Sequence, residues 1–408
     1  MIIHLFNPEH DLALAHNGRH FTPPHAAREL RMNLGYIPAL WAADGDIVLV
    51  DDSDFAQKAS RRLRSRMANV SFLTADEFRL RFNPQAVSLT PGECEVQVWG
   101  WDAAVRFQLS EAGVPQSLLP SDEQLTALRQ LSHRRTAVGL LAALRQHQSL
   151  ADLTVGESCE CRTMDDVLRI ISQWHHVVLK APWSSSGRGI KYVDGQLSRS
   201  QQGWCVNILR EQGSVVAEVY YNKVKDFGME FFSDGRGNVT YLGLSLFSTL
   251  NGAYTGNILA TEADKEQMLA AYLPAELTHA VRTQLEALLS QTIGAAYRGP
   301  LGIDMMVVSQ SSKDHAQSSD SHTQSSMFNA QSSDSNAQSS DFKVLSSKFK
   351  VQSSNFLLHP CVELNLRRTM GHVALALSKR LADSIENGSH KEMIITFNKN
   401  YELKISKH

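Results

Sequence analysis

Cysteine is scarce in this 408-residue chain, and its few thiols do not form a disulfide framework. The five cysteines are Cys94, Cys159, Cys161, Cys205 and Cys361. An odd number of scattered thiols is typical of a reducing compartment. Cys159 and Cys161 have the spacing of a metal-binding pair, but no second Cys or His pair at zinc spacing accompanies them. We therefore expect no metal at that pair.

The chain also lacks an excess of charge of either sign and any long apolar run. Its 40 basic and 42 acidic residues give a net charge of -2, so there is no general attraction to nucleic acid or to anionic membranes. No apolar run approaches the ~20 residues of a membrane span. The start, Met1–Phe6, has neither the basic flank nor the cleavage site of a signal peptide. These absences predict a cytoplasmic protein in which any anion must be held by local groups.

Residues 1–118 have the pattern of an α/β domain. Ile2–Phe6 and Ile47–Val50 read as strands, and Pro24–Leu34 reads as an amphipathic helix. The polar loop Asn7–Asp11 follows the first strand, where ligands bind in open α/β sheets, so it forms either a substrate wall or a turn with a helix cap. The nearby histidines indicate polar loop composition rather than a metal site; they are His4, His10, His16, His20 and His25.

Residues 119–300 continue the alternation of helices and strands. A capping signal at Leu119–Asp122 opens one helix, and Ser132–Arg135 starts another. A helix over 263–295 is expected to break near Pro274. The expected strands are Val177–Lys180, Val215–Tyr220, Gly228–Phe232, Val239–Leu246 and Leu301–Val308.

A serine-rich repeat then interrupts the chain. A Ser-Ser pair recurs every seven residues from 311 to 353, but serine at the core positions leaves no apolar seam for a coiled coil. We interpret 309–355 as a disordered insertion. If the strands on its two sides, Leu301–Val308 and Phe356–Arg367, form a hairpin, then a longer loop costs little.

The segment Val362–Arg367 carries the strongest functional signal. A strand sends alternate side chains to opposite faces, so Glu363, Asn365 and Arg367 share one face. Carboxylate and amide oxygens suit Mg²⁺, and the guanidinium suits a phosphate or carboxylate. In a hairpin, Asp304 would complete the oxygen ligands. The competing interpretation is a half-exposed edge strand.

Two further segments suggest a nucleotide. Lys180 leads into the Ser/Gly-rich loop Ala181–Gly189, where backbone N–H groups can approach phosphate oxygens, although an ordinary surface hairpin has the same composition. The loop has neither P-loop nor Rossmann spacing. Val215–Tyr220, followed by the charged connection and strand of Lys223–Glu230, suits an adenine slot with an acid for the ribose.

In their order along the chain, these motifs resemble the ATP-grasp superfamily over about residues 119–380. The resemblance implies an N-terminal pre-ATP-grasp-like domain at 1–118, a first lobe at 119–215 and a second lobe at 216–408 that contains the insertion 309–355. It places nucleotide contacts at Arg135, Lys180, Ser184, Ser185, Ser186, Gly187, Gly189, Glu218, Val219, Tyr220 and Asp226, with Glu230 competing for the ribose. It places the Mg²⁺ ligands at Asp304, Glu363 and Asn365, and catalytic cations at Lys180 and Arg367. Gly302 stands where many relatives have arginine.

The function that this resemblance implies is ATP- and Mg²⁺-dependent ligation. A small-molecule or peptide carboxylate would be activated as an acyl phosphate and joined to an amine or thiol. The alternatives are a phosphotransferase acting on a small molecule and a non-catalytic nucleotide-binding module. No nucleic acid or membrane partner is expected, and a homodimer is left open.

Overall fold

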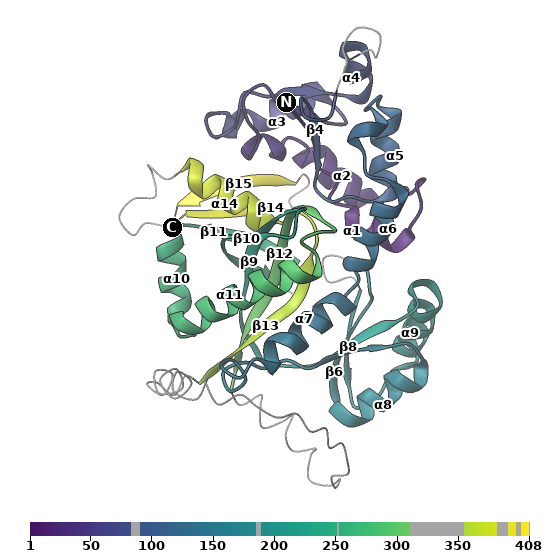
Figure 1. Ribbon diagram of the computed structural model, residues 1–408, viewed down its shortest axis with the longest axis vertical. Coiled ribbons are helices and arrows are strands. Elements are labelled where there is room, and N and C mark those ends of the chain that lie inside the picture. Colours follow the sequence, from purple (N-terminus) through teal and green to yellow (C-terminus); the bar gives the residue numbers. More distant parts are fainter. Residues whose placement is uncertain are drawn as a thin grey trace.

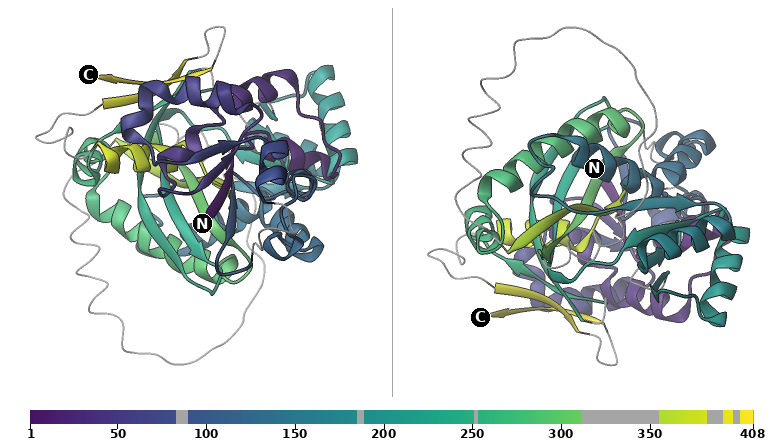
Figure 2. Two further views of the ribbon diagram at one scale, coloured as in Figure 1. Left: turned by 90° about the horizontal axis from the view of Figure 1, so that it is seen from above. Right: turned by 90° about the horizontal axis from the view of Figure 1, so that it is seen from below.

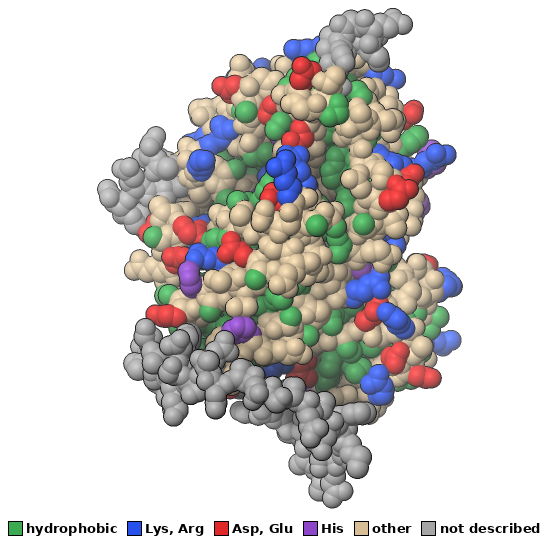
Figure 3. Space-filling view, in the orientation of Figure 1, with side chains coloured by type: hydrophobic (Ala, Val, Ile, Leu, Met, Phe, Trp, Pro, Cys, Tyr) green, Lys and Arg blue, Asp and Glu red, His purple; other side chains and the backbone are tan. Residues whose placement is uncertain are grey.

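The computed structural model describes residues 1–82, 90–184, 189–250, 253–310, 355–381, 391–396 and 401–407. Three sheets follow one another along the chain, first a parallel one and then two that are antiparallel (Figure 1). This confirms the expected class, an α/β part followed by α+β lobes. None of the described helices is both long and apolar enough to cross a membrane. On the face drawn in Figure 3, acidic and basic side chains are interspersed, in keeping with the balanced charge.

The N-terminal sheet has the strand order β3-β2-β1-β4 and is parallel throughout. Its strands are β1 (Ile2–Leu5), β2 (Ile47–Leu49), β3 (Ser71–Leu73) and β4 (Glu95–Val98). Its helices are α1 (His10–His16), α2 (His25–Leu34), α3 (Ser53–Ser60), α4 (Ala75–Arg81) and α5 (Ala103–Glu111). Short apolar strands alternate with the helices, and α3, α4 and α5 begin at side-chain caps; Asp102, for example, accepts the Val105 N–H at the start of α5.

The first lobe is built on a four-stranded antiparallel sheet with the order β5-β8-β6-β7. Its strands are β5 (Ser158–Cys161), β6 (His176–Lys180), β7 (Ile190–Asp194) and β8 (Val215–Val219). Its helices are α6 (Asp122–Leu131) and α7 (Arg135–Gln146), which lead into it, and α8 (Met164–Trp174) and α9 (Arg199–Gln212), which pack on it. The alternate residues Val177 and Leu179 are buried against α8 and α9, so Lys180, one residue after Leu179, faces the other side of the sheet.

The second lobe is a seven-stranded antiparallel sheet with the order β13-β12-β9-β10-β11-β14-β15. Its strands are β9 (Lys223–Asp234), β10 (Val239–Leu250), β11 (Ala253–Leu259), β12 (Arg298–Ser309), β13 (Phe356–Asn365), β14 (Lys391–Thr396) and β15 (Glu402–Lys407). Its helices are α10 (Glu262–Ala270), α11 (Ala275–Thr292) and α14 (Met370–Arg380). Helices α11 and α14 belong to different hydrophobic clusters on opposite faces of this sheet (Figure 2). Pro274 separates α10 from α11, where the sequence predicted a break.

The second lobe differs from the sequence-based expectation in three respects. Strand β9 begins at Lys223, so the segment expected to be a charged connection is part of the strand. Strands β11, β14 and β15 were not expected. Strand β13 ends at Asn365, so Arg367 lies just beyond it. Pairing with β12, which extends to Lys223, holds these charged residues in a strand that their intrinsic preference does not favour.

Strands β12 and β13 form the hairpin expected around the serine-rich insertion. They are antiparallel, with Ser309 opposite Phe356, and the Gln310 N–H donates to the Asn355 carbonyl at 2.8 Å. Residues 311–354 lie outside the described part of the chain. The pairing of β12 with β13 therefore extends to the residues that flank the insertion.

Replacing residues 311–354 with a short Gly-containing turn should leave the Tm unchanged or raise it. A shorter loop lowers the closure entropy, by about 2 kcal/mol for a tenfold change in length. Thermal denaturation and calorimetric titration with an ATP analogue measure the outcome. A marked loss of Tm or of nucleotide affinity would show that the repeat packs on the lobe.

Candidate functional site

The hairpin brings the three predicted metal ligands together. Asp304 on β12 lies directly opposite Glu363 on β13 in the antiparallel register. Asn365 donates from Nδ2 to Asp304 Oδ2 at 3.1 Å. The intervening Leu364 and Leu366 are buried in the core on the other face of the sheet. The alternation in the sequence therefore places an oxygen-rich cluster on one face.

Two neighbouring carboxylates make this cluster electrostatically strained. Burial raises the pKa of Asp304 to about 8, and the charges of Glu363 and Glu230 act in the same direction. A divalent cation would offset this charge. Among the described residues, no group of three or more His, Cys, Asp or Glu side chains is arranged to hold a metal. Two carboxylates and an amide do not form an all-protein cage around a metal. They still suit Mg²⁺, because Mg²⁺ usually retains waters and binds substrate phosphates.

Lys180 connects the first lobe to this hairpin. It ends β6, is 5% exposed, and its Nζ lies 2.5 Å from Glu218 Oε2 on β8. The same Nζ lies 3.5 Å from the Val362 carbonyl on β13. Its charge is therefore held beside the strand that carries two of the predicted metal ligands. Glu218, which the sequence predicts at the adenine hinge, is the ionic partner of Lys180.

Arg134, rather than the predicted Arg135, is the arginine in the cluster. Its Nη2 lies 2.9 Å from Glu363 Oε1, and its Nε donates to the Ala181 carbonyl at 2.9 Å. Its buried Nη1 has no hydrogen-bond partner among the described residues. Arg135 points elsewhere, because Nη2 donates to Gln130 and Nη1 lies 3.9 Å from Glu160. The side chains of adjacent residues at a helix start project about 100° apart. The sequence alone does not indicate which of the two arginines faces the cluster.

The Ser/Gly-rich loop is anchored at its base. The Ala181 N–H donates to the Gly189 carbonyl at 2.8 Å, and Arg134 Nη2 donates to Ser184 Oγ at 3.2 Å. A Cβ on Gly189 would lie 2.3 Å from the Ser184 Cβ, so the backbone approach requires glycine there. The predicted contacts Ser185, Ser186 and Gly187 lie outside the described residues.

The predicted adenine hinge joins the two lobes. The N–H groups of Val219 and Tyr220 donate to the carbonyls of Glu157 and His176, at 3.1 and 2.9 Å. Asp226, the predicted ribose acid, lies near the start of β9. Its carboxylate is 2.5 Å from Lys223 Nζ and accepts from Thr249 Oγ1 at 2.9 Å. The backbone N–H groups at 219 and 220 are thus already in use.

Glu230, the competitor for the ribose, is enclosed by the protein. It is 3% exposed, and a Cβ on Gly371 would lie 1.8 Å from its Oε1. A Cβ on Gly302 would lie 2.6 Å from Glu230 Oε2, so an arginine at 302 has no room. Of the two acids, Asp226 is therefore the one nearer the molecular surface.

Arg367 joins the hairpin to the N-terminal part of the chain. Its Nη2 and Nε donate to the carboxylate of Asp11 at 2.8 and 3.1 Å. Although burial opposes it, the Arg367 charge holds the pKa of Asp11 below its usual value. Asp11 belongs to the polar loop after β1, which the sequence marked as a candidate substrate wall. The structure places that loop beside Glu363 and Asn365, two of the predicted metal ligands.

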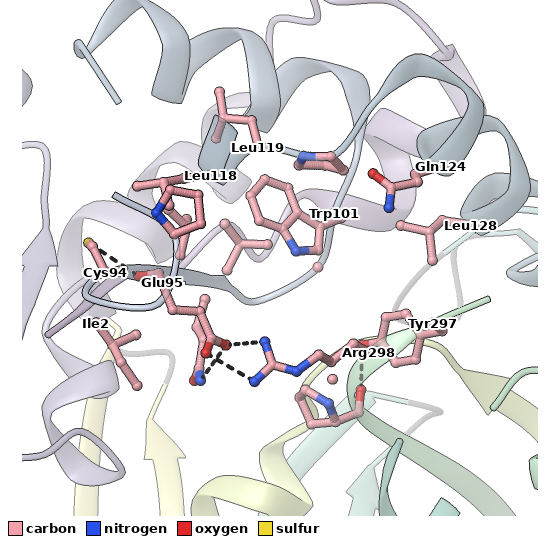
Figure 4. Close-up of a pocket in the computed structure, with 18 of the residues that line it drawn as sticks. Ile2, Cys94, Glu95, Trp101, Leu118, Leu119, Gln124, Leu128, Tyr297 and Arg298 are labelled. Carbon is pink, nitrogen blue, oxygen red and sulfur yellow. Dashed lines mark hydrogen bonds and ion pairs between the residues drawn. The ribbon is translucent and has the colours of Figure 1, made fainter. Parts of the chain in front are cut away.

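Part of the cluster lines a small cavity of about 20 Å³, although Asp304 and Lys180 do not. Its walls include His10, Asp11, Arg134, Glu363 and Asn365. A larger cavity of about 670 Å³ lies between β4 and the start of β12, where Arg298 forms an ion pair with Glu95 beneath Trp101 (Figure 4). None of the predicted site residues lines it. We place the candidate site at the smaller cavity because the ionisable groups converge there.

Comparisons with known proteins give structural likeness only. No family model matches the sequence, and no curated protein matches it. The solved structures that resemble the chain include N5-carboxyaminoimidazole synthetase from Staphylococcus aureus complexed with ADP, at 12% identity and a TM-score of 0.47, covering 97% of this chain and 82% of that one. A biotin carboxylase from Campylobacter jejuni in complex with β-γ-ATP has 12% identity and a TM-score of 0.48, with coverages of 97% and 75%. An L-amino acid ligase from Bacillus licheniformis has 12% identity and a TM-score of 0.42, with coverages of 97% and 79%.

Proposed function

We propose that the chain is an ATP-grasp enzyme that uses ATP and Mg²⁺ to activate a carboxylate as an acyl phosphate and joins it to an amine or thiol. The observation that carries the proposal is the meeting of Asp304, Glu363 and Asn365 with Lys180 and Arg134. Acidic metal ligands lie on the second lobe, and phosphate-binding cations reach them from the first. Phosphoryl transfer needs positioning and charge neutralisation, which this cluster can supply.

The order of groups along β9 supports one direction for the nucleotide. The hinge at Val219–Tyr220 precedes β9, Asp226 lies near its start, and Gly228 lies directly opposite Asp304. The five residue-to-residue steps from Lys223 to Gly228 span about 17 Å. We place the adenine beside the hinge, whose N–H groups at 219 and 220 stay bonded within the first lobe, the ribose at Asp226 and the phosphates between Lys180 and Arg134. The domain boundaries at 118/119 and 215/216 belong to the same proposal.

The residues fit the metal and the phosphates that this function requires. Asp304, Glu363 and Asn365 would hold Mg²⁺, which would neutralise charge on the phosphoryl group in transfer. Arg134 has a buried guanidinium nitrogen without an acceptor among the described residues, and a phosphate oxygen would supply one. Lys180 adds a point charge beside it. Arg367, which is held by Asp11, would place its positive charge where the substrate carboxylate binds.

Trapping with hydroxylamine tests the proposal. The protein is incubated with ATP, Mg²⁺ and hydroxylamine, together with a mixture of the twenty amino acids and their dipeptides, and both ADP and hydroxamate are measured. We expect both products, because an acyl phosphate reacts with hydroxylamine to give a hydroxamate. ADP without hydroxamate, when small alcohols are supplied instead, would identify a phosphotransferase. No ADP under any condition would indicate a non-catalytic module.

Lys180→Ala should weaken binding of a non-hydrolysable ATP analogue by one to two decades in Kd. A charge-assisted contact to phosphate contributes roughly 1.5 to 3 kcal/mol. Isothermal titration calorimetry measures the change. Lys265→Ala is the matched control, because Lys265 is 2% exposed and lies 2.9 Å from Glu262, away from the cluster. It should lower stability without changing Kd, whereas equal Kd values for both variants and the parent would make the Ser/Gly loop an ordinary hairpin.

A further inference from the structure

The polar loop after β1 is fixed at every polar side chain. Asn7 donates from Nδ2 to the Gly100 carbonyl at 2.8 Å, and Glu9 accepts from Arg31 at 2.9 Å. Asp11 is held by Arg367. A loop that served only as a turn would not need so many buried anchors, each of which must offset a desolvation cost. The remaining polar residue of the loop, His10, is held through its Nδ1 by Asp102.

The partner of His10 defines which ring nitrogen carries the proton. His10 Nδ1 lies 3.0 Å from Asp102 Oδ2, and both side chains are 2% exposed. The Asp102 carboxylate also accepts from the Val105 N–H at 2.8 Å and from Asn7 Nδ2 at 3.2 Å. Because these neighbours donate to it, the carboxylate acts as an acceptor toward His10. Nδ1 therefore bears the hydrogen, which leaves a lone pair on Nε2.

His10 also belongs to the candidate site. His10 lines the same small cavity as Arg134, Glu363 and Asn365. Gly100 packs against the ring so closely that a Cβ there would lie 2.7 Å from Nε2. Any side chain at position 100 would displace the ring, so glycine is required there for His10 to keep its contact with Asp102. A proton acceptor thus stands beside the groups that we assign to the phosphate and the metal.

A second histidine–aspartate pair in the N-terminal part of the chain shows what a purely structural pair looks like. His4 Nε2 lies 3.2 Å from Asp46 Oδ2, and His4 is 1% exposed. Its other nitrogen, Nδ1, is buried without a partner among the described residues. His4 does not line the cavity of the site. The two pairs therefore share chemistry and burial but differ in access to a substrate.

We propose that His10 is the general base for the amine acceptor and that Asp102 positions it; this rests on the proposed function. As the amine nitrogen forms its bond to the acyl carbon, the N–H proton that it loses passes to His10 Nε2. The bond from that carbon to the phosphate oxygen breaks, and phosphate leaves with the electron pair. The imidazolium is stabilised by Asp102 and then returns the proton to phosphate or water. Such proton transfer contributes about 10²- to 10⁴-fold.

The test compares two nucleophiles at one neutral pH in the full-length protein. Hydroxylamine is a free base at that pH and a strong nucleophile, so it needs little help from a general base. With the mixture of amino acids and dipeptides, His10→Gln should form hydroxamate at close to the parent rate, while amide formation falls about 10²- to 10⁴-fold. Asp102→Asn should show the same split, because an amide can retain the helix cap but favours the other tautomer of His10. His4→Gln is the matched control and should leave the ratio of hydroxamate to amide unchanged.

The other possible results distinguish a failure of the proposed base from a failure of the proposed function. Unchanged amide formation in His10→Gln, or an equal loss of amide and hydroxamate, overturns the role as base and leaves the proposed function standing. Parent protein that forms neither product overturns the proposed function and the base with it. If His10→Gln does not fold, Asp102→Asn and ¹⁵N NMR of the His10 ring decide the question. The spectrum should show Nδ1 protonated in the parent, and a proton on Nε2 instead would contradict the assignment.

Discussion

Replacing Glu363 with glutamine should abolish ADP release while leaving nucleotide binding and the fold in place. Glutamine keeps the shape of the side chain but removes the anion that faces Asp304. Since Mg²⁺ prefers hard anionic oxygens and its charge stabilises the transferred phosphoryl group, any loss reports electrostatics. We expect at least a 10³-fold loss of turnover, about 4 kcal/mol of activation free energy. ADP is measured with nucleotide above its dissociation constant, and circular dichroism checks the fold.

Glu95→Gln is the control for loss of an arginine partner. Glu95 pairs with Arg298 at 2.9 Å, as Glu363 pairs with Arg134, but it lines the other cavity. It should release ADP at the parent rate. Asn365→Ala, which removes the amide bonded to Asp304, should behave like Glu363→Gln. If Glu363→Gln hydrolyses ATP as fast as the parent, the alternating face of β13 is structural.

Local patterns in the sequence were sufficient to predict the elements that carry the site. The alternation from Val362 to Asn365 required a strand with two distinct faces, and its pairing with Asp304 followed from treating the insertion as a hairpin loop. The break at Pro274 and the cap before α6 also follow from local chemistry, since proline cannot continue a helix and Ser121 can accept an N–H from Gln124. These features depend on neighbours in sequence.

Long-range contacts could not be predicted in this way. The choice of Arg134 over Arg135 depends on how α7 packs against β13, and the burial of Glu230 depends on α14, which follows more than 130 residues later. The positions of Asp11 and Arg367 are separated by 356 residues, and nothing in either local sequence indicates the pair. One signal is present in the sequence: from fold topology, the polar loop after the first strand is a candidate substrate wall, with a turn and helix cap as the alternative.

Loss of the Asp11–Arg367 pair should reduce both stability and turnover. The side chains are 18% and 17% exposed, and the contact is made through two guanidinium nitrogens. Removing either partner leaves the other charge largely buried and unpaired, so Asp11→Leu or Arg367→Met should each cost about 3 kcal/mol of unfolding free energy. Urea denaturation measures this cost. Turnover should fall at least 10²-fold in Arg367→Met, because a cation beside the phosphates and the carboxylate is lost.

The double variant Asp11→Leu/Arg367→Met separates the two roles of Arg367. An apolar pair of similar volume often replaces a buried ion pair without loss, so unfolding free energy should return to within about 1 kcal/mol of the parent. Turnover should stay low, because the restored packing carries no charge. Arg367→Lys should retain part of the activity but lose the two-nitrogen contact with Asp11. If the double variant regains both stability and ADP release, Arg367 only fastens the N-terminal loop to the hairpin, and the carboxylate substrate must be held by another group.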